Sequence, residues 1–237
     1  IKNFKPLPSS YENFSIQDLN MSLSLIPPGS FIQGSPNRSS MQKLASFSNG
    51  KSFISGSHTG NLKNHELPVF ESRQLADLNS SITCLSISPN GEYCISGTKE
   101  GSVHLFELRE FKRVGRQKNQ DSPVTALKFN FQGTQFFSSW LSGKKGLYRL
   151  KDFTPIWETA SLEQNESVVD RVEFSKDDSL LLLSGESSAT HMIDAKSGKQ
   201  LLEFNNQEYP LIFSGFVGEE NSIANISRNG FLSFYEK

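Results

Sequence analysis

The chain has 237 residues, of which 24 are Lys or Arg and 25 are Asp or Glu, so its net charge is −1. This balance excludes a protein whose whole surface attracts nucleic acid or anionic lipid. The length corresponds to one large domain or two small ones. No stretch approaches the roughly 20 apolar residues that a spanning helix needs, and the first residues do not resemble a signal peptide. We expect an intracellular protein, cytoplasmic or nuclear, without membrane insertion.

The first 40 residues contain one strand-like pattern. Apolar residues alternate with polar ones at four positions, Leu19, Met21, Leu23 and Leu25. Pro27-Pro28-Gly29 then marks a turn, and Ser30–Ser35 follows it. Alternation beside a turn predicts two short strands. We treat residues 1–18 as a separate N-terminal segment.

The clearest pattern lies in residues 82–108. Three short runs of alternating apolar residues occupy Ile82–Ser88, Glu92–Gly97 and Ser102–Leu108. Turn signals separate them at Pro89-Asn90-Gly91 and at Lys99-Glu100-Gly101. Period-two alternation between glycine-bearing turns predicts an antiparallel meander with one buried face.

The same pattern recurs along the rest of the chain. The first-turn position recurs at spacings of 41, 42, 45 and 42 residues, at Gly50, Gly91, Gly133, Asp178 and Glu220. An acidic residue closes the third run of each unit at spacings of 41, 45, 42 and 42, at Glu66, Glu107, Asp152, Asp194 and Glu236. Two markers that keep one register over five units indicate an internal repeat. A strand-only period of about 40–45 residues is typical of a four-stranded propeller blade.

These residues resemble the WD40 repeat family. The resemblance rests on Ser88-Pro89-Asn90-Gly91, Ser96-Gly97, Glu100-Gly101 and the pair Phe106-Glu107, which stands where the family has Trp-Asp. No unit has a true Trp-Asp pair, so the chain resembles a divergent member. The resemblance implies an all-β fold, a β-propeller of four-stranded antiparallel blades, and favours seven blades with part of the chain absent from this sequence. The expected divisions are a half blade at 19–40 and blades at about 41–78, 79–120, 121–163, 164–206 and 207–237.

Each blade is expected to run from an inner strand to an outer strand. The inner strands are predicted at Ile82–Ser88, Val124–Asn130, Val168–Ser175 and Leu211–Phe216. The outer strands are predicted at Lys112–Gly115, Pro155–Thr159 and Lys199–Phe204. The run Leu180–Leu183 lacks alternation, which fits a strand whose two faces are both covered by neighbouring blades.

The two ends of the repeat look incomplete. The last unit stops at Tyr235-Glu236-Lys237, where its third strand ends. The family commonly completes its last blade with the first strand of the chain, and Ile1–Lys5 is the candidate closing strand. Gly29 precedes Gly50 by only 21 residues, which leads us to expect that about 20 or more residues are absent between roughly Ser35 and Met41. Six blades, seven blades, or a ring completed by a partner's strand all stay open.

No motif for catalysis or for metal binding occurs in the sequence. The four histidines, His58, His65, His104 and His191, are scattered over several units. Cys84 and Cys94 are too few for a disulfide framework and are typical of reduced core cysteines. We therefore expect no enzyme activity, no cofactor, no bound metal and no small-molecule substrate.

The strongest charge feature is a cluster of five cations within ten residues, Arg109, Lys112, Arg113, Arg116 and Lys118. It lies on a predicted outer strand and the loop after it. Lys144 and Lys145 begin a weaker cluster on the next blade, where the two clusters would be neighbours. One interpretation is contact with a phosphate or an acidic partner. The other is a solvated edge strand, where Lys and Arg prevent unwanted pairing.

The resemblance implies a subunit of a larger intracellular assembly. We expect a non-catalytic scaffold whose partners are other proteins of a complex. The alternative is an RNA-contacting subunit of a ribonucleoprotein particle that uses the basic cluster. The fold itself does not decide between them, because function belongs to sites that the fold displays.

Overall fold

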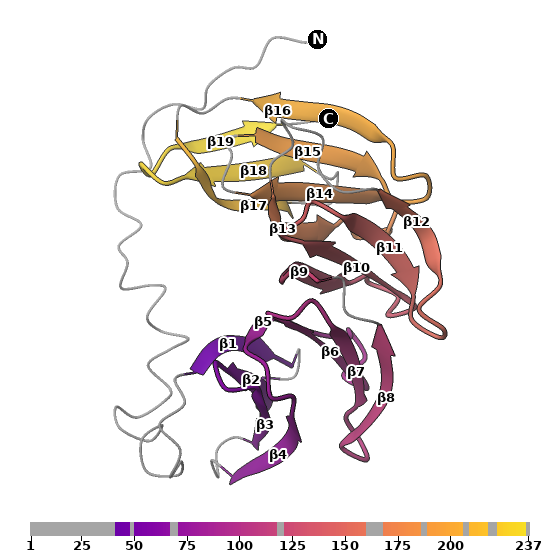
Figure 1. The fold of residues 1–237 in the computed structure, drawn as a ribbon. Coiled ribbons are helices and arrows are strands. Elements are labelled where there is room, and N and C mark those ends of the chain that lie inside the picture. Colours follow the sequence, from indigo (N-terminus) through magenta and orange to yellow (C-terminus); the bar gives the residue numbers. More distant parts are fainter. Residues whose placement is uncertain are drawn as a thin grey trace. The chain divides into compact units, whose positions relative to one another are not determined.

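The structure is a computed structural model that describes residues 41–47, 50–66, 71–117, 121–159, 168–185, 189–205, 209–217 and 222–235 (Figure 1). The predicted closing strand Ile1–Lys5, the rest of the N-terminal segment 1–18 and the half blade at 19–40 lie outside the described residues. So does the expected break after Ser35. These remain predictions.

The described residues form strands and turns, without a helix among them. The first sheet contains β1 (Met41–Ser46), β2 (Ser52–Ser57), β3 (Asn61–Glu66) and β4 (Glu71–Asp77). The second contains β5 (Ile82–Ile87), β6 (Tyr93–Thr98), β7 (Val103–Glu107) and β8 (Lys112–Gln117). The third contains β9 (Val124–Phe129), β10 (Gln135–Trp140), β11 (Lys145–Arg149) and β12 (Pro155–Thr159). The fourth contains β13 (Val169–Phe174), β14 (Leu180–Gly185), β15 (Ala189–Asp194) and β16 (Gln200–Asn205), and the last contains β17 (Leu211–Val217), β18 (Ser222–Ser227) and β19 (Leu232–Tyr235).

Every sheet is an antiparallel meander in chain order, so the predicted all-β propeller with four-stranded blades is confirmed. Four sheets have four strands and the last has three. The inner strands are β5, β9, β13 and β17, each within about one residue of its predicted bounds. The outer strand β8 continues two residues past the predicted end at Gly115. The number of blades in a complete ring stays a prediction.

The sheets pack face to face in the order in which they follow one another along the chain (Figure 1). Inner strand packs against inner strand, from β1 through β5, β9 and β13 to β17. Each interface has its own apolar cluster. In β14, Leu181 is buried against the third sheet while Leu182 is buried against the last one. The leucine run therefore lacks alternation because both of its faces are covered.

The first repeat marker is a backbone requirement. Gly50, Gly91, Gly133 and Asp178 all have a positive φ, between 59° and 72°. Glycine adopts this left-handed conformation without steric cost, and Asp tolerates it better than most residues do. The marker recurs because the described turns between an inner strand and the next strand need that conformation.

In the second, third and fourth sheets the second repeat marker caps the turn before the outer strand. Glu107 accepts hydrogen bonds from the backbone N–H groups of Arg109 and Glu110, and Asp194 accepts one from that of Ser197. In the third sheet the equivalent row position is held by Arg149, opposite Gln135. Asp152 lies three residues later and instead caps Thr154. This shift explains why the third unit has the irregular spacing.

Candidate functional site

The basic cluster on β8 is divided between two faces of the second sheet. Lys112 shares a cross-strand row with Tyr93, on the face that packs toward the third sheet. Arg113 and Arg116 lie in rows with Phe106 and His104, on the face toward the first sheet. The division follows from the two-residue alternation of a strand.

The cations of the two basic clusters differ in their contacts and in their exposure. The Arg116 Nη2 atom donates to Ser102 Oγ at 2.9 Å. Lys144 Nζ forms a salt bridge of 3.3 Å with Glu158, which also accepts a hydrogen bond from the Tyr148 hydroxyl. Lys145 is half-buried, Arg109 is exposed in the turn before β8, and Lys118 lies outside the described residues. The seven cations singled out from the sequence therefore do not form one continuous patch among the described residues.

A groove lies between the second and third sheets, on the side of the turns that precede their outer strands. Its cavity volume is about 650 Å³. Its lining is mainly apolar and includes Tyr93, Leu105, Val114, Leu150 and Phe153, with Lys151 among the charged residues. Sequence patterning did not predict this groove, because it depends on which outer-strand position carries a large side chain.

Val114 lies at a β-bulge of the outer strand β8. Leu105 pairs with Gly115 and Phe106 pairs with Arg113, which leaves Val114 as the extra residue of β8. Its side chain is 49% exposed. A bulge re-aims a side chain out of the regular alternation, and this one brings an apolar group to the groove.

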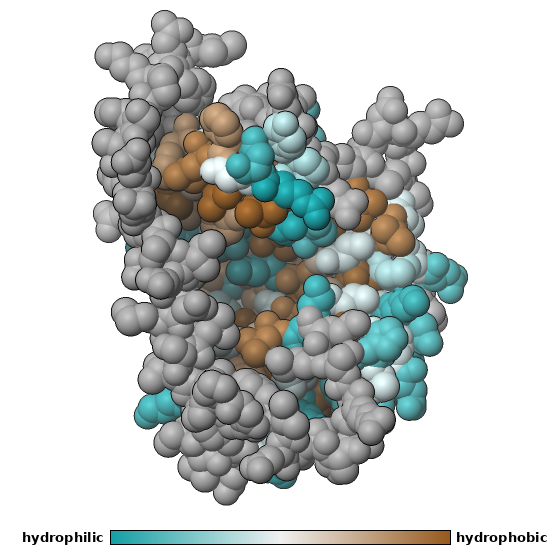
Figure 2. Space-filling view, turned by 90° about the vertical axis from the view of Figure 1, so that its left-hand side faces the viewer, coloured by the Kyte–Doolittle hydropathy of each residue, from teal (hydrophilic) through white to brown (hydrophobic). Residues whose placement is uncertain are grey.

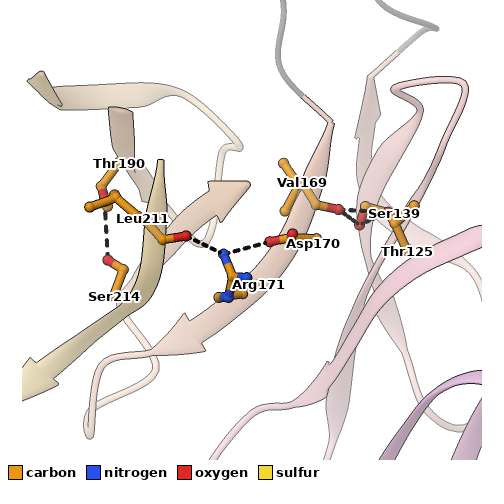
Figure 3. A network of polar contacts seen from close by, with 8 residues as sticks. All are labelled: Thr125, Ser139, Val169, Asp170, Arg171, Thr190, Leu211 and Ser214. Atoms are coloured by element: carbon orange, nitrogen blue, oxygen red, sulfur yellow. Dashed lines mark hydrogen bonds and ion pairs between the residues drawn. The ribbon is translucent and has the colours of Figure 1, made fainter. Parts of the chain in front are cut away.

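A polar network ties the inner strands of the third, fourth and last sheets together (Figure 3). The Val169 carbonyl accepts hydrogen bonds from Thr125 Oγ1 at 2.6 Å and from Ser139 Oγ at 3.1 Å. On the next residues, Arg171 Nη1 lies 3.1 Å from Asp170 Oδ1 and donates to the Leu211 carbonyl at 3.0 Å. The donors and acceptors of this network form hydrogen bonds with one another across the sheet interfaces. The network therefore connects the sheets and is not a ligand site.

The last sheet has one apolar face that no described sheet covers. Phe213, Ile226 and Leu232 form a cross-strand row on this face, and Phe234 lies on the same face two residues further along β19. Phe213 is 46% exposed and Leu232 is 52% exposed. Figure 2 shows apolar side chains gathered at the height that β17–β19 occupy in Figure 1. Within the described chain β19 is also an edge strand.

The cysteines and His65 are buried or partly buried. Burial raises the pKa of the Cys84 and Cys94 thiols to about 12, so neither supplies a thiolate at neutral pH. Burial and the charge of Lys63 lower the pKa of His65, whose ring stacks on Phe53. Across the described ranges no three His, Cys, Asp or Glu residues group as metal ligands. The same ranges contain no helix that is long and apolar enough to cross a bilayer.

The comparisons with known proteins agree with the repeat. Residues 72–107 match the family model described as WD domain, G-beta repeat. The chain is 32% identical over 126 residues to the Set1 complex component swd2 of Schizosaccharomyces pombe. The alignment covers 52% of this chain and 35% of that protein, so the chain spans about a third of this relative's length.

A solved structure shares the fold. The β-propeller domain of Cps50 (Swd1) from Myceliophteria thermophila superposes with a TM-score of 0.71 at 14% identity, covering 84% of this chain and 67% of that chain. At this identity the likeness shows the fold alone. The fold is thus a β-propeller of four-stranded blades, and the matched repeat at residues 72–107 together with the similarity to swd2 supports a WD40 repeat family for this chain.

Proposed function

We propose that this chain is a non-catalytic scaffold, a subunit of an intracellular multiprotein assembly that is nuclear or cytoplasmic. The observation that carries the proposal is its 32% identity to swd2, a protein named as a component of the Set1 complex. A relative that works as a complex component, on a propeller frame, favours the same kind of role here.

Two features of the surface support this proposal. The apolar face of the last sheet exposes large side chains such as Phe213 and Leu232, and contiguous apolar patches of this kind are typical of interaction sites. Within the described residues β19 is an edge strand, whose backbone donors and acceptors suit pairing with a partner's strand. Both features are typical of a subunit of a multiprotein assembly.

No specific observation favours the alternative role in RNA contact through the basic cluster. Lys144 is neutralised by Glu158, and Arg113 and Arg116 lie on the opposite face of β8 from Lys112. A phosphate backbone is held by several cations acting on one continuous surface. We therefore carry the scaffold forward alone.

The test is reciprocal purification. The full chain is tagged at its native expression level, purified at two salt concentrations, and its partners are quantified by mass spectrometry. We expect a small set of proteins in constant ratio to the chain, and the same set when one of those partners carries the tag instead. Recovery of the chain with no partner in constant ratio would contradict the proposal.

A further inference from the structure

We propose that the groove between the second and third sheets binds an acidic peptide segment of a partner protein and takes up one large apolar side chain of that segment. This inference rests on the proposed scaffold function and names one of its binding surfaces. It is argued from the shape, the lining and the charge of the groove.

The groove exists because one outer-strand position lacks a side chain. Arg73 of β4, Gly115 of β8 and Trp157 of β12 occupy equivalent positions, opposite Asn64, Leu105 and Leu147 respectively. The guanidinium of Arg73 lies over the ring of Phe111, 4.2 Å from its centroid, at the interface of the first and second sheets. Trp157 packs on Gly198 at the interface of the third and fourth sheets, where an added Cβ would lie 2.6 Å from its ring. Only glycine stands at this position between the second and third sheets.

Phe153 forms the floor of the groove. A Cβ on Gly115 would lie 2.5 Å from the Phe153 ring, so the ring packs directly on the β8 backbone. Phe153 has a φ of 59°, a left-handed conformation that a bulky residue rarely adopts. Phe111 and Gly198 share this conformation at the equivalent turns, with φ of 56° and 72°. The Phe153 ring thus packs on the β8 backbone and also lines the groove, where it offers an apolar surface.

The apolar walls suit one inserted side chain. Val114 is half exposed at its bulge, and Tyr93 and Leu150 face the same space. A cavity of about 650 Å³ is large enough for a leucine or an aromatic residue together with its flanking backbone. Interface energy is usually concentrated in such a central apolar pocket, with polar residues around it.

The charges around the groove select an acidic partner. Lys112 and Lys151 are exposed and form no salt bridge within the described part of the chain. The charged residues that line the groove in the described chain are Arg116 and Lys151, which are both cations, and no carboxylate lines it there. The groove therefore combines positive charge with an apolar interior. Carboxylates that flank an apolar side chain complement this arrangement.

The experiment compares two synthetic peptide libraries on the full chain. Each peptide has about ten residues with one central Leu, Phe or Trp, and the flanking residues are acidic in one library and basic in the other. We expect enrichment of the acidic library. Fluorescence polarisation of an enriched peptide should show about tenfold weaker binding after Val114→Asp, and a similar loss after the double change Lys112→Glu with Lys151→Glu.

Matched controls come from the fourth sheet. Leu201 is the bulge residue of β16 and is 46% exposed, so Leu201→Asp repeats the Val114 change away from the groove. Lys196→Glu with Lys199→Glu repeats the charge reversal at the equivalent turn. Binding should change less than about twofold in both controls.

Several results would overturn the groove proposal. These are no enrichment of the acidic library, equal losses in the controls, or binding of an oligouridylate through Lys112 and Lys151 that does not need Val114. If the peptide fails to bind but the chain still purifies with its partners, the groove proposal fails and the scaffold proposal stands. If the peptide binds as expected but the chain purifies alone, the scaffold proposal fails instead.

Discussion

Asp178 Oδ2 accepts a hydrogen bond of 2.9 Å from Asn130 Nδ2, and this contact joins the first turns of the third and fourth sheets. The same carboxylate accepts from the backbone N–H groups of Phe131 at 2.7 Å and Gln132 at 3.0 Å. Three donors of one sheet thus converge on one carboxylate of the next. In the fourth sheet the residue at the turn-marker position therefore also holds two neighbouring blades together.

Replacing Asp178 with Ala removes both acceptor oxygens and all three hydrogen bonds, and we expect the free energy of unfolding to fall by roughly 1–3 kcal/mol. Asp178→Gly removes the same acceptors but suits the φ of 59°, so it should cost less than Asp178→Ala. Asp178→Asn keeps one acceptor and should cost least. Urea unfolding of the four proteins measures this order, and identical midpoints would contradict the inter-sheet role of Asp178.

Trp140 links the second and third sheets through its indole. The side chain is fully buried and Nε1 donates to the Gly101 carbonyl at 2.9 Å. Trp140→Phe should lower the free energy of unfolding by roughly 2–4 kcal/mol, because it leaves a void and an unpaired carbonyl. Trp157→Phe is the control, since Trp157 donates to the Ala195 carbonyl in the same way but is only half-buried. A larger loss for Trp157→Phe than for Trp140→Phe would contradict this interpretation.

Gly97 allows two sheets to approach each other. A Cβ there would lie 2.5 Å from Cys84 Sγ and 2.7 Å from Val124 Cβ. We expect Gly97→Ala to destabilise the protein by roughly 1–3 kcal/mol through overpacking, and an added Cys84→Ala to restore part of this loss. Gly50→Ala is the control, because no atom would lie within 4 Å of its Cβ and only its φ of 65° opposes the change. If Cys84→Ala gives no relief in the Gly97→Ala protein, close packing is not the reason for this glycine.

His104 makes the stability of the fold depend on pH. It is 5% exposed, and burial together with Arg116 and Arg113 lowers its pKa to about 4. In the unfolded chain the pKa is about 6.5, so between these values the unfolded state binds more protons than the folded state. Stability from this group is therefore fully present above about pH 6.5 and is lost as the pH falls toward 4. Urea unfolding from pH 7 to pH 4 should show this loss, and His104→Gln should reduce it. If NMR shows that the imidazole of His104 titrates near pH 6.5 in the folded protein, burial does not lower its pKa and this pH dependence is wrong.

The sequence predicted the parts of the fold that repeat locally. Gly91 and Asp178 could be aligned because each turn needs a left-handed residue, and that requirement is visible without a structure. Glu107 and Asp194 could be aligned because each caps the turn that follows it. The strand bounds then followed from the alternation between these fixed points.

The parts that depend on contacts between sheets were not predictable in this way. The charge run from Arg109 to Lys118 looked like one patch, but the alternation of β8 sends Lys112 and Arg113 to opposite faces. Gly115 alone did not indicate a groove in the sequence. Its importance appears only when it is compared with Arg73 and Trp157, the large side chains at the equivalent rows of the neighbouring sheets. The groove therefore depends on a position at which the blades differ. A repeat pattern shows only the positions at which the blades are alike.

The central claim is that this β-propeller protein works as one subunit of a multiprotein assembly. Sedimentation of a native cell extract, with the full chain detected at its natural level, tests this claim most directly. We predict that the chain sediments as a discrete particle well above the mass of the isolated chain and shifts to the isolated position only after the assembly is dissociated. A chain that sediments alone in the untreated extract would contradict the claim.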